Sequence, residues 1–259
     1  MQGYLLIAIG QRYIDEAKLL VDTLRKQGDN RPVVIIIDSN DVSYFINLEI
    51  DAKYVILNGA DNDFKYFNTD FERKGTYPKI KLYHYSPFEE TIFVDSDVLC
   101  QTSTEKLWSF VGSQQQDVLM TGRKHDMGWA GGDIGNIISK FGKHIPHVHG
   151  GFVYFRKPQA EQFYSFIMET VKNYDRWCGW RHYKGSMPDE LLYAMTFGEF
   201  GYEPVNFDQF PIMTFDIPPD QIPTKFQTSE GKTLDDYIPF IHMINRSIHK
   251  PVYDKIINQ

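Results

Sequence analysis

Short runs of hydrophobic residues alternate with helical patterns through the first hundred residues. Residues 4–9, YLLIAI, are continuously apolar, as expected of a strand that is buried on both faces. Residues 13–28 place apolar side chains at helical spacing and end at Gly28, which predicts an amphipathic helix. The alternation continues with strands predicted at 31–39, 52–57 and 91–97, and helices at 41–48 and 77–86. Strands that alternate with helices predict an α/β fold with a Rossmann-like, mostly parallel sheet.

The second half of the chain has a less regular pattern. Strands are predicted at 117–122 and 150–157, and helices at 160–174 and 189–200. From residue 203 onward the sequence is rich in Pro and Asp, apart from an apolar patch at YIPFIHMI. Because no repeat or convincing linker divides the sequence, we expect one domain over residues 1–259, whose first half binds a ligand and whose second half completes the site.

Composition and charge argue against several kinds of partner. Of the 259 residues 42% are hydrophobic and 24% charged, as in ordinary globular proteins. The formal net charge of −7 disfavours nucleic acid and anionic membranes as partners. The apolar run near the amino end is too short for a signal peptide or a membrane span. Cys100 and Cys178 show no framework spacing, which favours a reducing compartment, so we expect a cytoplasmic protein.

Two aspartates follow a predicted strand at the place where α/β proteins bind ligands. Asp95 and Asp97, in TIFVDSD, come directly after an apolar run, and Gly10 and Asp38 end two other predicted strands. On an extended strand, side chains two residues apart point to the same side, so both carboxylates would meet at one place. A hard cation such as Mg²⁺ or Mn²⁺ would remove their repulsion. A plain surface turn is the alternative for an Asp-x-Asp sequence.

Several segments, in their order along the chain, resemble the GT-A glycosyltransferases of family 8, the glycogenin and bacterial galactosyltransferase group. They are the first strand with Gly10 and Tyr13, then TYPKIKL, TIFVDSD, HGGFVYF, DELLYA and IHMINRSIHKP. The most specific part is the aspartate pair with Lys79, which precedes Asp95 by 95 − 79 = 16 positions. The resemblance covers nearly the whole chain. It implies a GT-A fold, a UDP-sugar donor, Mn²⁺ (or Mg²⁺) and retention of anomeric configuration.

The resemblance also implies that the two halves of the single domain bind different parts of the substrates. Residues 1–100 would be the nucleotide-binding half and residues 101–259 the acceptor and donor-sugar half. The residues with an implied role at the nucleotide end are Ala8, Ile9 and Gly10 around the uracil, Tyr13 stacked on the base, Lys79 and Ser96 at the donor, Asp95 at the ribose and metal, and Asp97 at the metal. For Tyr13 a packed core aromatic is the alternative, and for Lys79 a solvated surface lysine.

Two segments of the second half correspond to the family's donor-sugar site. His149, Gly150 and Gly151 stand where the family has an Asn-Ser-Gly strand, so the histidine is a departure from that pattern. Glycines there would let a sugar approach the backbone closely. DELLYA corresponds to the family's Asp-Gln helix start, so the resemblance implies a catalytic role near the anomeric carbon for Asp189 or Glu190. A helix cap is the alternative for Asp189.

The carboxyl-terminal segment IHMINRSIHKP resembles the family's His-x-x-Gly-x-x-Lys-Pro-Trp segment. The resemblance implies that His242 is the third metal ligand and Lys250 the pyrophosphate partner, with Arg246 as a substitute cation. The spacing of 250 − 242 = 8 is two longer than the family pattern, the glycine is missing and Val252 replaces the tryptophan. We expect residues 238–255 to close over the donor, and a permanently packed tail is the alternative.

Two further sets of residues leave alternatives open. The segment HIPHVH allows a zinc site, although no cysteine or fourth ligand is near it in sequence. Its histidines are His144, His147 and His149. Aromatic residues in two loops are candidates for stacking on an acceptor sugar, with ordinary packing as the alternative. They are Trp129, Trp177, Trp180 and Tyr183.

The function expected from the sequence is metal-dependent transfer of glucose or galactose, with retention, from a UDP-sugar to an unidentified acceptor. The acceptor would be a glycan, a protein or a small molecule. Retention could proceed by front-face attack or by double displacement through Asp189, and the sequence leaves both open. Two other functions remain: a non-catalytic sugar-nucleotide or glycan-binding protein, and a metal-dependent nucleotidyltransferase. Against the last, AIGQRYID has no Gly-rich, basic triphosphate loop after the first strand.

Overall fold

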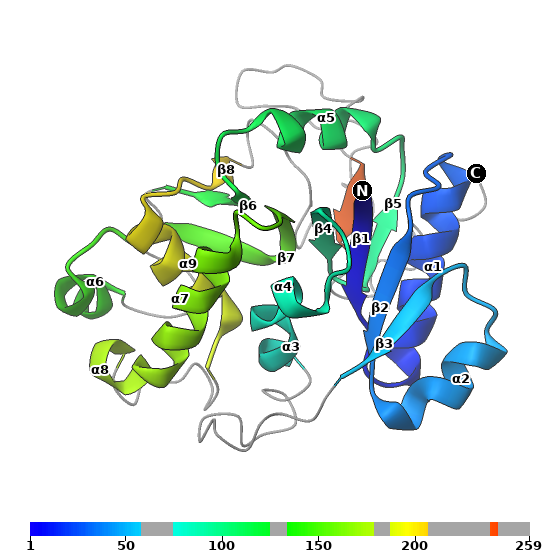
Figure 1. Cartoon of the computed structure of the whole chain (residues 1–259), viewed down its shortest axis with the longest axis horizontal. Coiled ribbons are helices and arrows are strands. Elements are labelled where there is room, and N and C mark those ends of the chain that lie inside the picture. The colour runs from blue at the N-terminus through cyan, green and yellow to red at the C-terminus, as the bar shows by residue number, and fades with distance from the viewer. Residues whose placement is uncertain (58–74, 125–133, 179–186, 207–238, 243–259) are drawn as a thin grey trace, which may run out of the picture.

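A seven-stranded sheet runs through the centre of the protein (Figure 1). The computed structural model describes residues 1–57, 75–124, 134–178, 187–206 and 239–242. In spatial order the strands are β3 (Lys53–Ile56), β2 (Val33–Ile37), β1 (Gln2–Ile7), β4 (Glu90–Val94), β7 (His147–Arg156), β6 (Val118–Arg123) and β8 (Val205–Asn206). This sheet confirms the predicted α/β class.

The sheet is parallel except at one strand. β1 pairs in parallel with β2 and β4, β2 with β3, and β6 with β8. β7 runs antiparallel to both of its neighbours, β4 and β6. The mostly parallel sheet that the sequence predicts is therefore confirmed. The antiparallel strand, β7, carries the HGG sequence next to the end of β4.

Apolar side chains on both faces of the central strands explain why their sequences are continuous hydrophobic runs. Along β1, Tyr4 and Leu6 pack into the core on one face and Leu5 into the core on the other, all fully buried. Successive side chains of a strand point to opposite faces, so a strand covered on both sides needs an apolar residue at every position. β2 repeats the pattern with five buried residues in succession.

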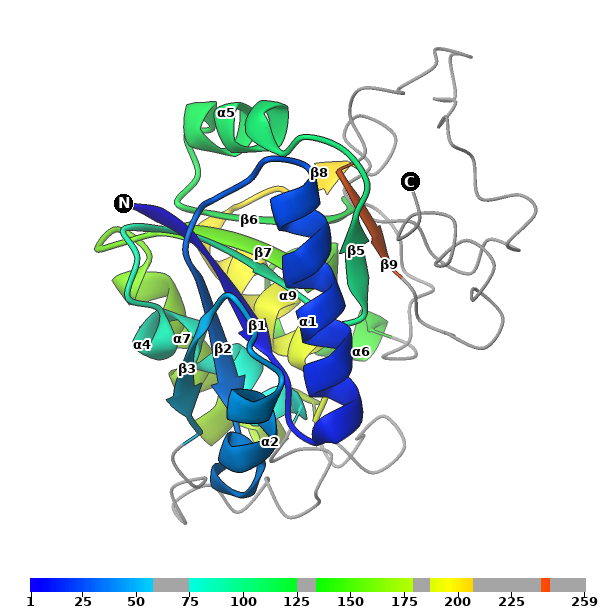
Figure 2. The same ribbon diagram turned by 90° about the vertical axis from the view of Figure 1, so that its right-hand side faces the viewer.

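Helices cover both faces of the sheet (Figures 1 and 2). Those on the face of Tyr4 and Leu6 are α1 (Gln11–Lys26), α2 (Val42–Asn47) and α5 (Glu105–Ser113), with the 3₁₀-helix η1 (Ser39–Asp41) before α2. Those that contribute to the opposite core are α3 (Tyr77–Ile80), α4 (Leu82–Tyr85), α6 (Gly135–Phe141), α7 (Glu161–Lys172), α8 (Tyr174–Cys178) and α9 (Asp189–Phe200). Among the described residues, no helix has both the length and the apolar character of a membrane span.

A second, two-stranded sheet lies beside α1 (Figure 2). It pairs β5 (Val98–Cys100) with β9 (Phe240–His242) in antiparallel register. Its buried side chains, among them Val98 and Phe240, belong to the same core as α1. The sequence pattern predicts neither strand, because each is only three residues long.

The predicted boundaries are wrong in two places that matter for the site. Residues 77–86 form two short helices rather than one, with the break at Lys81, whose φ and ψ of −109° and 16° are not helical. The strand predicted at 91–97 ends at Val94, so the aspartate pair lies beyond it.

Candidate functional site

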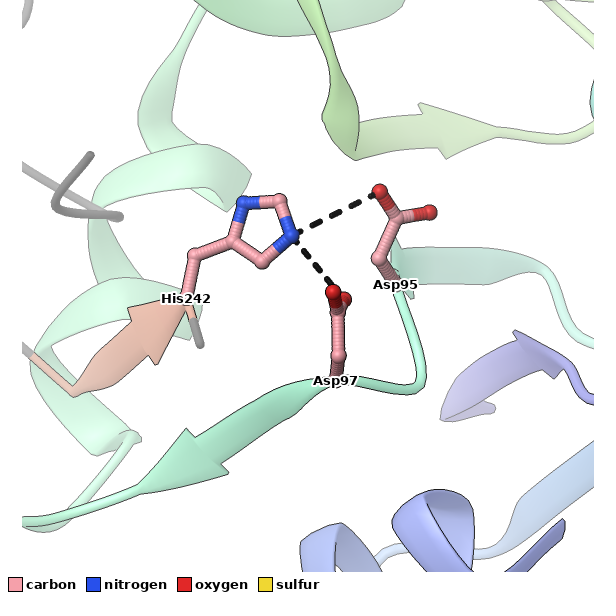
Figure 3. A group of neighbouring side chains, drawn as sticks. All are labelled: Asp95, Asp97 and His242. Carbon is pink, nitrogen blue, oxygen red and sulfur yellow. Dashed lines mark hydrogen bonds and ion pairs between the residues drawn. The ribbon is translucent and has the colours of Figure 1, made fainter. Parts of the chain in front are cut away.

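Asp95 and Asp97 lie in the connection between β4 and β5, not on an extended strand. Residues 96 and 97 form a turn before β5 begins at Val98. The expected cause of their alignment, the alternation of side chains along a strand, is therefore wrong. The turn takes the chain from the main sheet into the small sheet, and both carboxylates still point toward the same side chain, that of His242 (Figure 3).

The small sheet brings His242 to the aspartate pair. In the antiparallel register of β5 and β9, Val98 lies opposite His242, which places the histidine one position from Asp97. His242 Nε2 is 2.9 Å from Asp97 Oδ1 and 4.0 Å from Asp95 Oδ2 (Figure 3). The histidine is buried, with 8% of its surface exposed. Three β5–β9 residue pairs thus bring together side chains that are 145 positions apart in sequence.

The three side chains have the chemistry of a divalent-cation site. Each offers one ligand atom, and these atoms all lie within 4.8 Å of one another. Carboxylate oxygens suit Mg²⁺ and Mn²⁺, and an imidazole nitrogen suits transition metals. Within the described part of the chain this is the one group of at least three such residues, so His144, His147 and His149 do not form the zinc site that the sequence left open.

The pKa shifts of Asp95, Asp97 and His242 show that a positive charge near the two carboxylates is favourable. Burial acts to raise the pKa of Asp97, but the hydrogen bond with His242 and the charges of His242 and Lys79 together outweigh it and the pKa is lowered. Burial acts to lower the pKa of His242, but the hydrogen bond with Asp97 and the charges of Asp97 and Asp95 together outweigh it and the pKa is raised. Burial raises the pKa of Asp95, although Lys79 and His242 oppose the shift. A bound cation would meet the same demand for positive charge.

Lys79, on α3, lies between two carboxylates. Its Nζ is 2.9 Å from Asp95 Oδ1 and 3.5 Å from Asp189 Oδ2, and its side chain is 19% exposed, so it is not the solvated lysine of the alternative. The hydroxyl of Tyr193 on α9 donates a 2.7 Å hydrogen bond to the Lys79 carbonyl, which fixes α3 against α9. Burial acts to lower the pKa of Lys79, but Asp95 and Asp189 outweigh it and the pKa is raised. The ammonium therefore stays charged.

Asp189 and Glu190 begin α9 and face β7. The residue that caps α9 is Pro188, so Asp189 is not the helix cap of the alternative. Glu190 Oε1 accepts a 3.0 Å hydrogen bond from the Gly150 N–H. A Cβ at Gly150 would lie 2.7 Å from Asp189 Oδ2, so a larger residue there would force this carboxylate to move from its position beside β7. Burial, followed by the charge of Asp189, raises the pKa of Glu190 to about 7.

His149 connects the carboxylates of α9 with the candidate metal centre. Its Nδ1 accepts a hydrogen bond from the Gly151 N–H at 3.2 Å, and its Nε2 lies 3.6 Å from Glu190 Oε1. Its ring centroid is 5.7 Å from that of His242. Burial, together with His242 and Lys79, lowers the pKa of His149 well below its usual value. The ring is therefore neutral, with its proton on Nε2 facing Glu190.

The residues expected at the uracil form the connection between β1 and α1. Ala8 and Ile9 are buried, and Gly10 adopts a φ of 98°, a left-handed conformation that favours glycine. The Gly10 N–H donates to Asp41 Oδ2 at 2.7 Å. Tyr13 is 47% exposed, so it is not the packed core aromatic of the alternative, and its ring is accessible to a base. Ser96, in the aspartate turn, is buried.

Several predicted residues lie outside the described part of the chain or belong to the core. Lys250 and Arg246, with the rest of the expected closing segment beyond residue 242, are not among the described residues, and neither are Trp129, Trp180 and Tyr183. Trp177, on α8, packs edge-on against Phe141 at 5.5 Å between ring centroids, in favour of the packing alternative. Cys100 is a buried free cysteine, whose pKa burial raises to about 12.

Comparisons by sequence and by structure give different results. No family model and no curated protein matches the sequence. The structure is similar to that of LgtC, a galactosyltransferase in complex with donor and acceptor sugar analogues, with a TM-score of 0.62 and 13% identity over 100% of this chain and 95% of LgtC. Mouse xyloside xylosyltransferase 1 gives a TM-score of 0.61 and 11% identity over 96% of this chain and 99% of that one.

A third similar structure is the glycosyltransferase GlyE of Streptococcus pneumoniae, with a TM-score of 0.59 and 11% identity. The match covers 100% of this chain and 61% of GlyE. At such low identity the likeness is one of fold. The chain has the fold of the GT-A glycosyltransferases, and the predicted resemblance to the family 8 enzymes is confirmed at that level.

Proposed function

We propose that the protein is a metal-dependent, retaining glycosyltransferase that moves glucose or galactose from a UDP-sugar to an acceptor hydroxyl. The observation that carries the proposal is the group of Asp95, Asp97 and His242, whose ligand atoms gather within 4.8 Å just beyond the carboxyl end of β4. Ligands of α/β sheets bind at that edge. The neighbours in fold include proteins described as galactosyl- and xylosyltransferases, which supports glycosyl transfer as the reaction.

Asp95, Asp97 and His242 would hold Mn²⁺ or Mg²⁺. A cation bound there supplies positive charge next to the donor diphosphate and so stabilises the negative charge that grows on UDP as it leaves. Lys79 adds a permanent positive charge beside Asp95 and would contact a donor oxygen. No described side chain has to act as a strong acid, because UDP leaves as an anion that these charges stabilise.

The remaining residues would bind and orient the donor. The exposed ring of Tyr13 would stack on the base at the start of α1, and the backbone of Gly10 would line the uracil. Gly150 and Gly151 leave the backbone of β7 open to the sugar. Asp189, 3.5 Å from Lys79, is the carboxylate that a double displacement would use. In the front-face route an oxygen of the departing phosphate takes the proton of the acceptor hydroxyl instead.

A hydrolysis screen tests the proposal. Release of free hexose is measured with UDP-glucose, UDP-galactose and other nucleotide sugars, and release of pyrophosphate with nucleoside triphosphates and a hexose 1-phosphate, each with Mn²⁺ and with EDTA. We expect slow release of hexose from UDP-glucose or UDP-galactose when Mn²⁺ is present and none in EDTA. Asp97→Asn should abolish it, whereas Asp22→Asn, the same change at an exposed residue of α1 that pairs with Lys18, should not.

Three results would contradict the proposal. Equal release with Mn²⁺ and with EDTA would remove the metal from the mechanism. Binding of UDP-sugars without turnover in any condition, with candidate acceptors present, would indicate a sugar-nucleotide-binding protein. Turnover of nucleoside triphosphates in preference to UDP-sugars would indicate a nucleotidyltransferase.

A further inference from the structure

Lys79 joins the candidate metal centre to a second pair of carboxylates, those of Asp189 and Glu190. One ammonium group lies 2.9 Å from Asp95 Oδ1 and 3.5 Å from Asp189 Oδ2. On the β7 side, His149 makes a second connection, because its ring packs near that of His242 and its Nε2 faces Glu190. A sugar carried on a diphosphate beside Asp95 would lie on the side of the metal centre from which Lys79 and His149 lead to Asp189 and Glu190.

The Glu190 carboxylate is held in place by the strand beneath it. Oε1 accepts the Gly150 N–H at 3.0 Å and lies 3.6 Å from His149 Nε2. The histidine is itself fixed, because Nδ1 accepts the Gly151 N–H. The Glu190 side chain is 23% exposed, so part of the carboxylate is accessible to a ligand. A group held in this way keeps its position when a donor arrives.

The charges around Glu190 are not balanced within the described part of the chain. Lys79 is the one lysine in this cluster, and its ammonium already faces Asp95 and Asp189. His149 lies at ion-pair distance from Glu190, but its ring is neutral. A UDP-sugar brings the further negative charge of its diphosphate. An additional carboxylate on the sugar would meet a fixed anion without a matching cation among these residues.

We infer that Glu190 determines donor specificity by favouring an uncharged sugar, such as glucose or galactose, over a uronic acid. This inference rests on the proposed function, because it assumes that a nucleotide-linked sugar binds beside the candidate metal centre. Two like charges about 6 Å apart repel enough to weaken binding by roughly 3- to 100-fold between the dielectric limits of water and of a protein surface. An effect of about tenfold is the central expectation.

The experiment measures dissociation constants by calorimetry with Mn²⁺ present. The ligands are UDP, UDP-glucose, UDP-galactose and UDP-glucuronate, and the proteins are wild type, Glu190→Gln and Glu199→Gln. A glutamine keeps an oxygen that can accept the Gly150 N–H while it removes the charge. Glu199 lies on the same helix and pairs with Lys143, so its variant is a matched control. A pH of about 8 keeps Glu190 ionised, because its pKa is about 7.

The wild type should bind UDP-glucuronate about tenfold more weakly than the better of the two neutral donors. Glu190→Gln should reduce that ratio to about threefold or less, and Glu199→Gln should leave it unchanged. If neutral donors and UDP-glucuronate bind the wild type equally, or if Glu190→Gln leaves the ratio intact, the inference is wrong while the proposed function stands. If none of the proteins binds UDP, the proposed function fails and the inference fails with it.

Discussion

Replacing Glu190 by glutamine should stabilise the protein against unfolding at alkaline pH when no metal is present. In the folded state burial, followed by the charge of Asp189, raises the pKa of the Glu190 carboxyl group from the ordinary 4.5 to about 7. The folded state therefore keeps this proton to a higher pH than the unfolded chain does. Between pH 4.5 and about 7 the folded state binds more protons, so stability falls as the pH rises through that window.

The size of the effect follows from the width of the window. A pKa difference from 4.5 to about 7 corresponds to about 3 kcal/mol as an upper limit. Because the side chain is 23% exposed, solvent screening reduces the expected loss to roughly 1–2 kcal/mol. A glutamine cannot ionise, so Glu190→Gln should avoid that loss. The other groups around position 190 titrate in both proteins, so the difference between the two reports the removal of the Glu190 carboxyl group together with its effect on these neighbours.

Urea denaturation in EDTA measures the difference directly. The free energy of unfolding is determined at about pH 4.5 and about pH 8 for wild type, Glu190→Gln and Glu199→Gln. Relative to wild type, Glu190→Gln should gain roughly 1–2 kcal/mol between the two pH values, and Glu199→Gln should gain nothing. An equal effect of Glu190→Gln at both pH values would refute the reasoning, because Glu190 would then ionise in the folded protein as it does in the unfolded chain.

Two further substitutions test the arrangement around Lys79 and β7. Lys79→Met should weaken binding of UDP-glucose with Mn²⁺ by roughly 1–3 kcal/mol, the range for loss of a charge-assisted hydrogen bond, and unchanged affinity in calorimetry would remove Lys79 from the donor site. Gly150→Ala should lower the free energy of unfolding by about 1–3 kcal/mol, because its Cβ would lie 2.7 Å from Asp189 Oδ2. Urea denaturation checks this, and Gly112→Ala, whose Cβ would meet no atom closer than 3.9 Å, should not lower the free energy of unfolding.

The parts of the fold that the sequence predicts are those with a strong local pattern. β1 and β2 are continuous apolar runs because each is buried on both faces, and α1 shows a helical stripe because one side packs on the sheet. The aspartate pair is also predictable, since it follows the buried run of β4 directly. In each case neighbouring residues in sequence carry the signal.

The parts that the sequence does not predict depend on contacts between distant residues. β5 and β9 are three residues each, too short for a pattern, and their pairing spans more than a hundred positions. Only the family resemblance identified His242 as a ligand, and only the structure shows how the strand register places it. The contact of Glu190 with Gly150 joins residues 40 positions apart, so no local signal for it exists, although the glycine in HGG marked a close approach.

A cation held by Asp95, Asp97 and His242 is central to the proposed function, and the affinity for UDP tests it most directly. Calorimetry of UDP binding to the wild-type protein is carried out with Mn²⁺ and again with EDTA, alongside Asp97→Asn with Mn²⁺. The account predicts that wild type binds UDP at least about tenfold more tightly with Mn²⁺ than with EDTA, and that Asp97→Asn loses this gain. Equal affinity for UDP in Mn²⁺ and in EDTA would contradict the central claim.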